Sequence, residues 1–164
     1  MGNGPERGAI LGLILGLLAP FLSVAVANAA ECSADKIQMR GDWGRAFFNV
    51  ELAQTDEEHG QGLMFRETLQ PRSGMLFLFE TPRNAQFWMK NTLIPLDMIF
   101  IAPTGIVKHI HHEATPGDLT PIKGGPGIVA VLELAGGTAR RFGVNVGSHI
   151  RHPYFSNENA VWPC

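Results

Sequence analysis

The sequence lacks a cluster of positive charge, and it has no strong excess of charge of either sign. Its 164 residues include 13 Lys and Arg against 15 Asp and Glu, so the formal net charge is −2. Proteins that bind nucleic acid need Lys and Arg gathered on one surface to contact the phosphates. We therefore expect no nucleic-acid partner.

Internal repeats and heptads are also absent, which gives no support to a solenoid or a coiled coil. Turn-forming residues are frequent instead, with 19 Gly and 11 Pro in the chain. Many turns between short apolar segments are typical of a β-rich body with short connections. The length suits one core once a leader segment is removed.

Cysteine is scarce, with only Cys32 and Cys164 present. An even number of cysteines in an exported protein favours a disulfide. We hypothesise that the two residues pair and join the ends of the mature chain. The alternatives are two free thiols on frayed ends, or a bond to another chain.

Residues 1–30 have the pattern of a secretory signal peptide. Arg7 supplies the positive charge, an apolar run follows from Ala9, and Ala27-Asn28-Ala29 resembles the small-residue cleavage pattern. Cleavage after Ala29 or Ala30 would give a periplasmic or secreted protein. The alternative is an uncleaved anchor in the inner membrane through residues 9–27, because about 20 apolar residues are enough to span a bilayer.

The mature chain is predicted to be mainly β, a compact β-sandwich or barrel-like domain with two short helices. The domain is expected at residues 31–152, followed by a C-terminal tail at 153–164. Thr55 and Glu58 form a capping box that predicts a helix over 56–64. Strands are predicted at 36–40, 46–53, 75–79, 86–89, 97–102, 105–112 and 128–134, with a turn plus strand at 144–150. A second helix is predicted at 138–142 before Gly143, and a long Gly/Pro loop at 113–127.

Five short segments occur in an order that resembles the bacterial and archaeal domain-of-unknown-function 192 family. They are Gly-Leu-Met-Phe-Arg at 62–66, Gly-Met-Leu-Phe at 74–77, Trp-Met-Lys-Asn-Thr at 88–92, Ile-Pro-Leu-Asp at 94–97 and Leu-Glu-Leu with a following Gly at 132–136. The resemblance implies a single compact, mainly β domain that is often exported. It implies no activity, because the family is uncharacterised.

Polar residues within these apolar segments form the candidate ligand-binding site. A polar group among large apolar neighbours is either a paired member of the core or part of a lined pocket. In a pocket, Arg66 and Lys90 would bind an anion, and Asp97 or Glu133 would act as acceptor or base. In a core, Arg66 would pair with one of those carboxylates. The candidates are Arg66, Trp88, Lys90, Asn91, Asp97 and Glu133.

The sequence therefore favours a monomeric, non-catalytic periplasmic module that binds a small polar ligand or an envelope protein, with no cofactor. One alternative is an enzyme that uses Asp97 or Glu133 as general base on a polar or anionic substrate. Another is metal binding through His109 and His111, which alternate and so share one face of a predicted strand. A third metal ligand would have to come from elsewhere, and solvent-exposed histidines on a hairpin are the simpler interpretation.

Overall fold

The computed structural model describes residues 1, 2, 4 and 32–164. The predicted signal peptide over residues 1–30, and its alternative as a membrane anchor, lie almost entirely outside the described residues. Within the described part of the chain, no helix is both long enough and apolar enough to cross a membrane.

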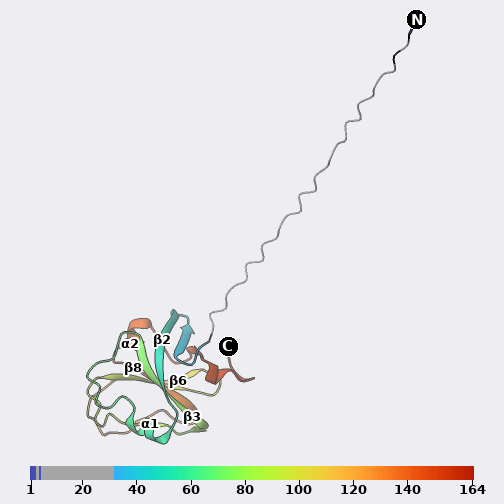
Figure 1. Ribbon diagram of the computed structural model, residues 1–164. Helices are drawn as coiled ribbons and strands as arrows, with labels where there is room; N and C mark the ends of the chain where they lie inside the picture. The colour runs from blue at the N-terminus through green and yellow to red at the C-terminus, as the bar shows by residue number, and fades with distance from the viewer. Residues whose placement is uncertain (3, 5–31) are drawn as a thin grey trace.

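Seven strands form one curled mixed sheet, with both antiparallel and parallel strand pairs, and two short strands form a separate ribbon (Figure 1). The order across the large sheet is β6-β5-β8-β3-β2-β1-β9, and the ribbon is β4-β7. The strands are β1 (Lys36–Gly41), β2 (Gly44–Ala53), β3 (Ser73–Arg83), β4 (Gln86–Phe87), β5 (Leu96–Ile101), β6 (Val107–Ala114), β7 (Ile122–Lys123), β8 (Ile128–Ala135) and β9 (His149–Arg151). The helices are α1 (Asp56–Gln61), α2 (Thr138–Phe142) and a 3-10 turn, η1 (Pro153–Phe155).

The two edge strands of the large sheet meet and close it. Ile106, just before β6, bridges His149 of β9, and Val107 donates its N–H to the Ser148 carbonyl at 2.9 Å. Ile150 in turn donates to the Gly105 carbonyl at 2.8 Å. Closure satisfies backbone groups that an open edge would leave unpaired. The fold is therefore a compact β domain of barrel-like form, as the sequence predicted.

Side chains on the two faces of this sheet form two separate cores. Residues from every strand of the large sheet pack into the first core, which includes Ile37, Phe48 and Leu132. The second core is formed mainly by the other face of β3, β5 and β8, with Ala53 at the end of β2 and Ala114 at the end of β6, together with the ribbon and the loops around α1. The first core fills the curled sheet, and the second lies between its outer face and a partial outer layer.

Local sequence explains both helices, which lie at opposite ends of the sheet in Figure 1. The predicted capping box of α1 is confirmed: Thr55 accepts from the Glu58 N–H, and Glu58 accepts from the Thr55 N–H. The helix stops earlier than the predicted residue 64, because Gly62 adopts a positive φ of 48°. Gly143, with φ of 79°, ends α2 as expected.

The expected loop over 113–127 was wrong in two respects, because β6 extends to Ala114 and β7 lies within the range. Ile122 pairs with Phe87 and so adds the second strand of the ribbon. Two residues are too few for a periodic pattern, so no local signal predicts this pairing. β3 is also longer than predicted, and it runs parallel to β2 because the connection through α1 crosses over.

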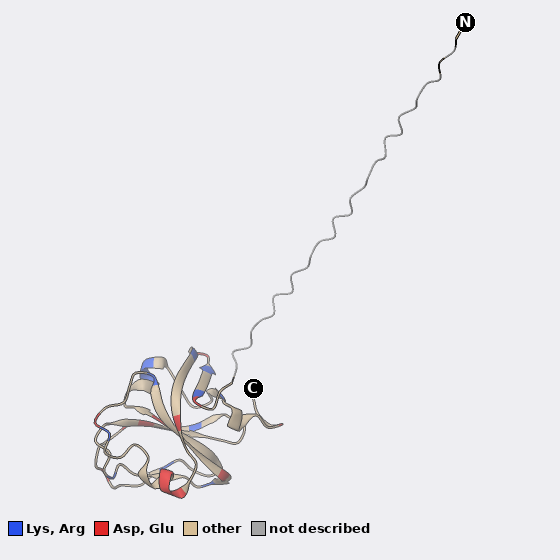
Figure 2. Cartoon of the chain, in the orientation of Figure 1, with Lys and Arg blue, Asp and Glu red and all other residues tan. Residues whose placement is uncertain are grey.

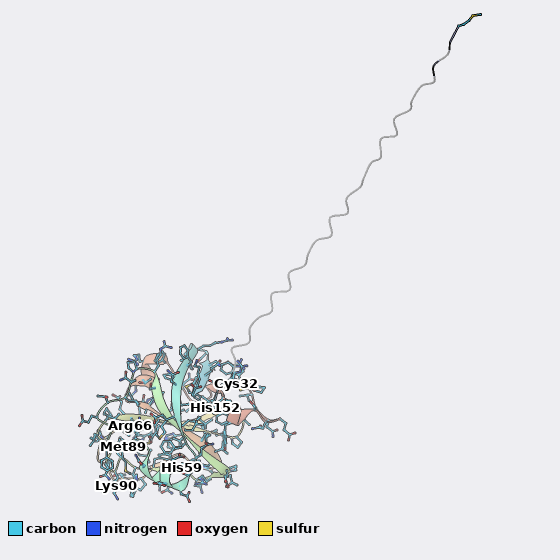
Figure 3. All side chains as sticks on the ribbon, in the orientation of Figure 1. Cys32, His59, Arg66, Met89, Lys90 and His152 are labelled. Atoms are coloured by element: carbon cyan, nitrogen blue, oxygen red, sulfur yellow. A yellow bond between two sulfur atoms is a disulfide. The ribbon has the colours of Figure 1, made fainter. Side chains whose placement is uncertain are left out.

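The C-terminal segment is fastened to the rest of the molecule. Cys32 and Cys164 form the predicted disulfide. Phe155 is buried in the first core, and the Tyr154 hydroxyl donates to the Phe79 carbonyl at 2.6 Å. His152 contacts the Ala34 carbonyl at 2.9 Å, on the same side as Cys32 (Figure 3). The segment therefore contributes to the core and is not a loose tail.

Replacing both cysteines by serine is expected to lower the free energy of unfolding. The bond closes a loop with a sequence separation of 132 residues. The chain-entropy model gives about 5 kcal/mol for a loop of this size, and removal of native disulfides typically costs about 2–5 kcal/mol. Urea unfolding of the oxidised protein and the double serine variant measures the difference. The reduced wild-type protein should match the variant, and equal stability of all three forms would contradict the prediction.

Candidate functional site

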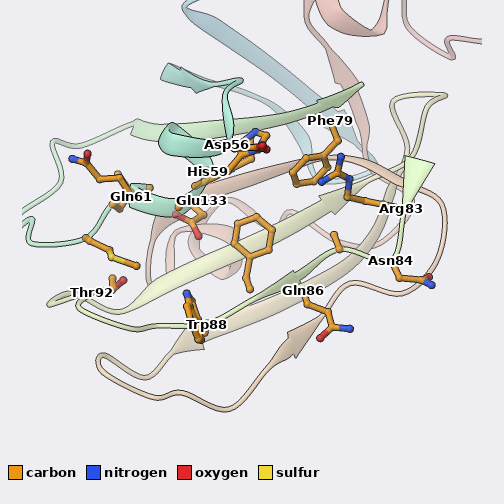
Figure 4. Close-up of a pocket in the computed structure, with 17 residues that line it drawn as sticks. Asp56, His59, Gln61, Phe79, Arg83, Asn84, Gln86, Trp88, Thr92 and Glu133 are labelled. Carbon is orange, nitrogen blue, oxygen red and sulfur yellow. The ribbon is translucent and has the colours of Figure 1, made fainter. Parts of the chain in front are cut away.

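A cavity of about 390 Å³ lies in the outer layer, and we call it the Glu133 pocket. One wall of the pocket is formed by α1 and the residues after it, and another by β3 and the ribbon. Glu133 of β8 lines the pocket from the large sheet (Figure 4). The aromatic lining residues are Phe77, Phe79, Phe87 and Trp88, and the polar ones are Asp56, His59, Gln61, Arg83, Asn84, Gln86, Thr92 and Glu133.

Strand register places Glu133 on the outer face of the sheet. Glu133 lies opposite Met75 of β3 and Met98 of β5, which both belong to the second core. Glu133 is only 4% exposed, and burial raises the pKa of its carboxyl to about 8. No ion pair or hydrogen bond of this carboxyl is found among the described residues, and burial is the sole cause of the shift. An acid group that is protonated at neutral pH therefore faces a cavity without a protein partner.

The rim and wall of the pocket are held in place by ring packing. Phe87 meets Phe77 edge to face, with ring centroids 5.0 Å apart, and His59 meets Phe79 at 5.1 Å. The His59 Nε2 also lies 3.0 Å from the Ala53 carbonyl, which fixes the ring between α1 and β2. Edge-to-face pairs of this kind stabilise a defined arrangement. The apolar half of the pocket is thus preformed.

Three loops beside the pocket are joined through backbone hydrogen bonds. Phe65 donates to the Asn91 carbonyl at 2.8 Å, and Met89 donates to the Asp118 carbonyl at 2.9 Å. Asn91 has a positive φ of 54°, a conformation that asparagine tolerates better than most residues. The irregular backbone before Pro95 is therefore tied to the neighbouring loops.

The predicted cluster of charged residues does not converge on one site, and Asp97 is the clearest correction. In the β5–β8 register Asp97 lies opposite Leu134, so its side chain is on the inner face of the sheet, away from Glu133. Its carboxylate is fully buried and accepts from the N–H groups of Glu113, Gly137 and Ala139 at 2.8, 3.1 and 2.7 Å. Asp97 thus caps α2, whose own N-cap residue Gly137 has no side chain to do so. This geometry speaks against Asp97 as a general base.

Arg66 and Lys90 also differ from the expected arrangement. Arg66 forms a two-pronged ion pair with Glu51, at 2.6 Å for each contact, and not with Asp97 or Glu133. The pair raises the pKa of Arg66 and lowers that of Glu51, mainly through its hydrogen bonds. The Lys90 ammonium lies 5.3 Å from the centre of the Trp88 ring. Of the six predicted residues, Trp88 and Glu133 line the pocket.

His109 and His111 share one strand face, because they lie opposite Phe100 and Met98 of β5. Burial lowers the pKa of His111, and His109 and His112 lower it further. No group of three or more metal-ligating side chains occurs in the part of the chain that the structure describes. Glu113, the carboxylate that directly follows these histidines, is paired with Arg140. The metal hypothesis gains no support from this arrangement.

Comparison with known proteins places the chain in a family. The model of the domain-of-unknown-function 192 family (DUF192), described as an uncharacterised ACR, matches residues 37–152. The chain belongs to this family, as its five motif segments indicated. Four of these segments contribute to the Glu133 pocket, through Leu63, Phe77, Trp88 and Glu133 respectively. The fifth carries Asp97.

Two solved structures are similar to this chain. A Novosphingobium aromaticivorans DSM 12444 protein of unknown function is 43% identical, with a TM-score of 0.69, and the match covers 70% of this chain and 82% of that protein. A Sinorhizobium meliloti 1021 protein, described as a candidate transcription regulator, is 38% identical with a TM-score of 0.68. That match covers 73% of this chain and 93% of the other. The comparison with curated proteins yields no match.

The Asp97→Ala substitution is expected to destabilise the fold strongly. It leaves three N–H groups without their acceptor. Each unsatisfied buried group costs about 1–3 kcal/mol, so we expect a total loss of roughly 3–5 kcal/mol in urea unfolding. Glu113→Ala is the control, because it removes only the exposed pair with Arg140 and should cost about 1 kcal/mol or less. Wild-type stability of Asp97→Ala would refute the capping role.

The stability of Glu133→Gln relative to wild type is expected to rise with pH. The pKa of Glu133 is about 8 in the folded protein, against a reference value of 4.5. Between these values the folded state holds a proton that the unfolded state has lost, so wild-type stability falls as pH rises. The slope is at most about 1.4 kcal/mol per pH unit.

Urea unfolding of both proteins at pH 5, 6.5, 8 and 9 measures this difference. Glutamine resembles the protonated acid, so the two proteins should have similar stability at pH 5, and the gap should level off above pH 8. Titration of all other groups is common to both proteins and cancels in the difference. A gap that is independent of pH would show that Glu133 ionises normally.

Proposed function

We propose that this protein is an exported, non-catalytic binding protein that holds a small ligand in the Glu133 pocket. The observation that carries the proposal is the buried, unpartnered carboxyl of Glu133 at the wall of a preformed cavity of about 390 Å³. Ligand sites are mostly apolar concave surfaces with a few convergent polar groups, and natural cores rarely leave such a group without a partner.

Two features support export. The first is the signal-like pattern of residues 1–30, and the second is the Cys32–Cys164 disulfide, since such bonds persist in oxidising compartments. We propose a periplasmic or secreted location and a monomer. Nucleic acid is not part of the proposal, because the chain has a net charge of −2 and the α1 side of the pocket is acidic (Figure 2).

The position of the family motifs supports the choice of this pocket. The segments that carry the resemblance to the family are far apart in sequence, yet four of them supply lining residues. Two further cavities lie elsewhere, one beside β1 and β9 and one beside Arg72 and Arg141. We therefore expect the ligand function to be a property of the family fold.

A second candidate function is catalysis with Glu133 as general acid or base. The pKa of about 8 favours it, because groups that transfer protons work best when their pKa lies near the ambient pH. It differs from simple binding in one measurable respect, which is turnover. Proton NMR of any ligand that binds should show an unchanged ligand after prolonged incubation if the protein only binds.

Obstructing the pocket is expected to abolish the thermal stabilisation produced by a ligand. Gly60 lines the cavity on the α1 side, and a Cβ at this position would meet no atom within 4 Å, so Gly60→Phe should fold and add a bulky side chain to that wall. The test is a thermal-shift screen of the mature, oxidised protein against small metabolites, because a ligand that binds the native state raises the melting temperature.

The control is Glu57→Phe, which adds the same side chain to α1 at an exposed position that does not line the pocket. Compounds that stabilise wild type and Glu57→Phe but not Gly60→Phe support the proposal. Compounds that stabilise all three proteins equally bind elsewhere, and that result would overturn it.

A further inference from the structure

The lining of the Glu133 pocket contains two carboxyl groups, those of Asp56 and Glu133, and one guanidinium, that of Arg83. Asp56 begins the acidic first turn of α1, which continues with Glu57 and Glu58 outside the lining. Figure 4 shows Glu133 with His59 and Gln61 of α1 on one side and Trp88 on the other. The carboxyl in the wall and the acidic turn beside the pocket both favour a cation over an anion.

The aromatic wall provides the second element of cation recognition. Cations within about 6 Å of a ring centre are attracted by the negative face of the ring. Two of the pocket's rings already carry protein cations: the Arg83 guanidinium lies 4.3 Å from the centre of Phe79, and the Lys90 ammonium lies 5.3 Å from the centre of Trp88. Aromatic rings on this side of the molecule thus hold positive charge, and in these two contacts the charge is that of the protein's own Arg83 and Lys90.

The protein supplies no cation of its own to Glu133. Arg83 is the one Lys or Arg side chain that lines the pocket, and its charge lies over Phe79. Neither Arg83 nor Lys90 contributes to the ionisation of Glu133, for which burial is the sole cause of the shift. Arg66, the other nearby guanidinium, is held by Glu51. The Glu133 carboxyl therefore remains available to pair with the charge of a cationic ligand.

We infer that the ligand is a small organic cation, an amine or a quaternary ammonium compound, whose charge pairs with the Glu133 carboxylate between the aromatic side chains. This inference rests on the proposed function and specifies its ligand class. Binding requires Glu133 to release its proton to solvent. A neutral or anionic ligand would instead favour the protonated carboxyl, so the pH dependence of affinity distinguishes the two classes.

The experiment compares probes that differ only in charge. Choline has an uncharged isostere, 3,3-dimethylbutan-1-ol, and an anionic analogue, 3,3-dimethylbutanoate; benzylamine and benzyl alcohol form a second pair. Calorimetric titration of the mature, oxidised wild-type protein gives the affinity of each probe from pH 6 to pH 9. The same titrations are made with Glu133→Gln, which keeps the shape of the carboxyl, and with Gly60→Phe.

We expect at least one cation to bind wild type more tightly than its uncharged isostere. For choline, whose charge does not change with pH, affinity should rise up to about tenfold per pH unit below pH 8 and then level off. Glu133→Gln should bind each cation no better than its isostere, and Gly60→Phe should bind neither.

Four results would overturn the inference. Equal affinity of cation and isostere, or full cation affinity in Glu133→Gln, refutes the cation class. Tighter binding of the uncharged or anionic probe than of the cation, lost in Gly60→Phe, also refutes it but leaves the proposed binding function intact. If no probe binds, the inference fails, and the proposed function fails with it only if no metabolite shows pocket-dependent stabilisation.

Discussion

The register between β5 and β8 determines what each buried carboxylate can do. Side chains alternate between the faces of a strand, so a shift by one residue would exchange the two environments. As paired, Asp97 enters the inner core beside Leu134, and Glu133 enters the outer core beside Met98. The two acids are therefore close in the sheet but belong to different chemical settings. One of them is fully satisfied by the backbone, and the other has no partner.

The curled sheet also explains why a pocket exists at all. A closed sheet with a filled interior needs no further layer, but the outer faces of β3, β5 and β8 carry large apolar residues. These apolar residues are shielded from water by short elements. They are the two-residue strands of the ribbon, the six-residue helix α1 and the loops between them. Short elements joined by loops cover a curved face incompletely, and the space that remains contains Glu133.

Burial of Glu133 is unfavourable for the fold taken alone. A carboxyl without a hydrogen-bond partner loses its hydration, and it avoids the larger cost of a buried charge only by remaining protonated. A leucine at this position would suit the strand Ile128–Ala135, whose other residues are all apolar. Stability alone therefore does not account for the residue, which supports the proposed binding role. Glu133 differs in this from Asp97, whose three hydrogen bonds make it part of the structure.

The sequence was sufficient for features that depend on a few neighbouring residues. The capping box at Thr55, the hairpin of β5 and β6, and the end of α2 at Gly143 all follow from local patterns and occur as predicted. Glu133 and Trp88 were also identified, because each stands out from its surroundings. The disulfide followed from the number of cysteines and their positions.

Features that depend on pairing between distant segments could not be predicted in the same way. Nothing in the local sequence shows that β5 pairs with β8, so the opposite faces of Asp97 and Glu133 were not foreseeable. The partner of Arg66 lies fifteen residues earlier in β2, and it becomes a neighbour only through the parallel β2–β3 crossover. His59 and Arg83 reach the pocket for the same reason, since neither has a local signal of function.

The C-terminal clip and the pocket occupy different parts of the molecule. Cys32 and His152 lie together in Figure 3, separated from His59 and Lys90. The clip also places Trp162 over Arg40 of β1, with the guanidinium carbon 4.3 Å from the ring centre, next to β9, the strand that closes the sheet against the start of β6. Cys32 and residues 153–164 lie outside residues 37–152, which the family model matches. A bond that stabilises the β1–β9 side of the sheet can offset the unfavourable burial of Glu133 without constraining the pocket, because it acts on strands that do not line it.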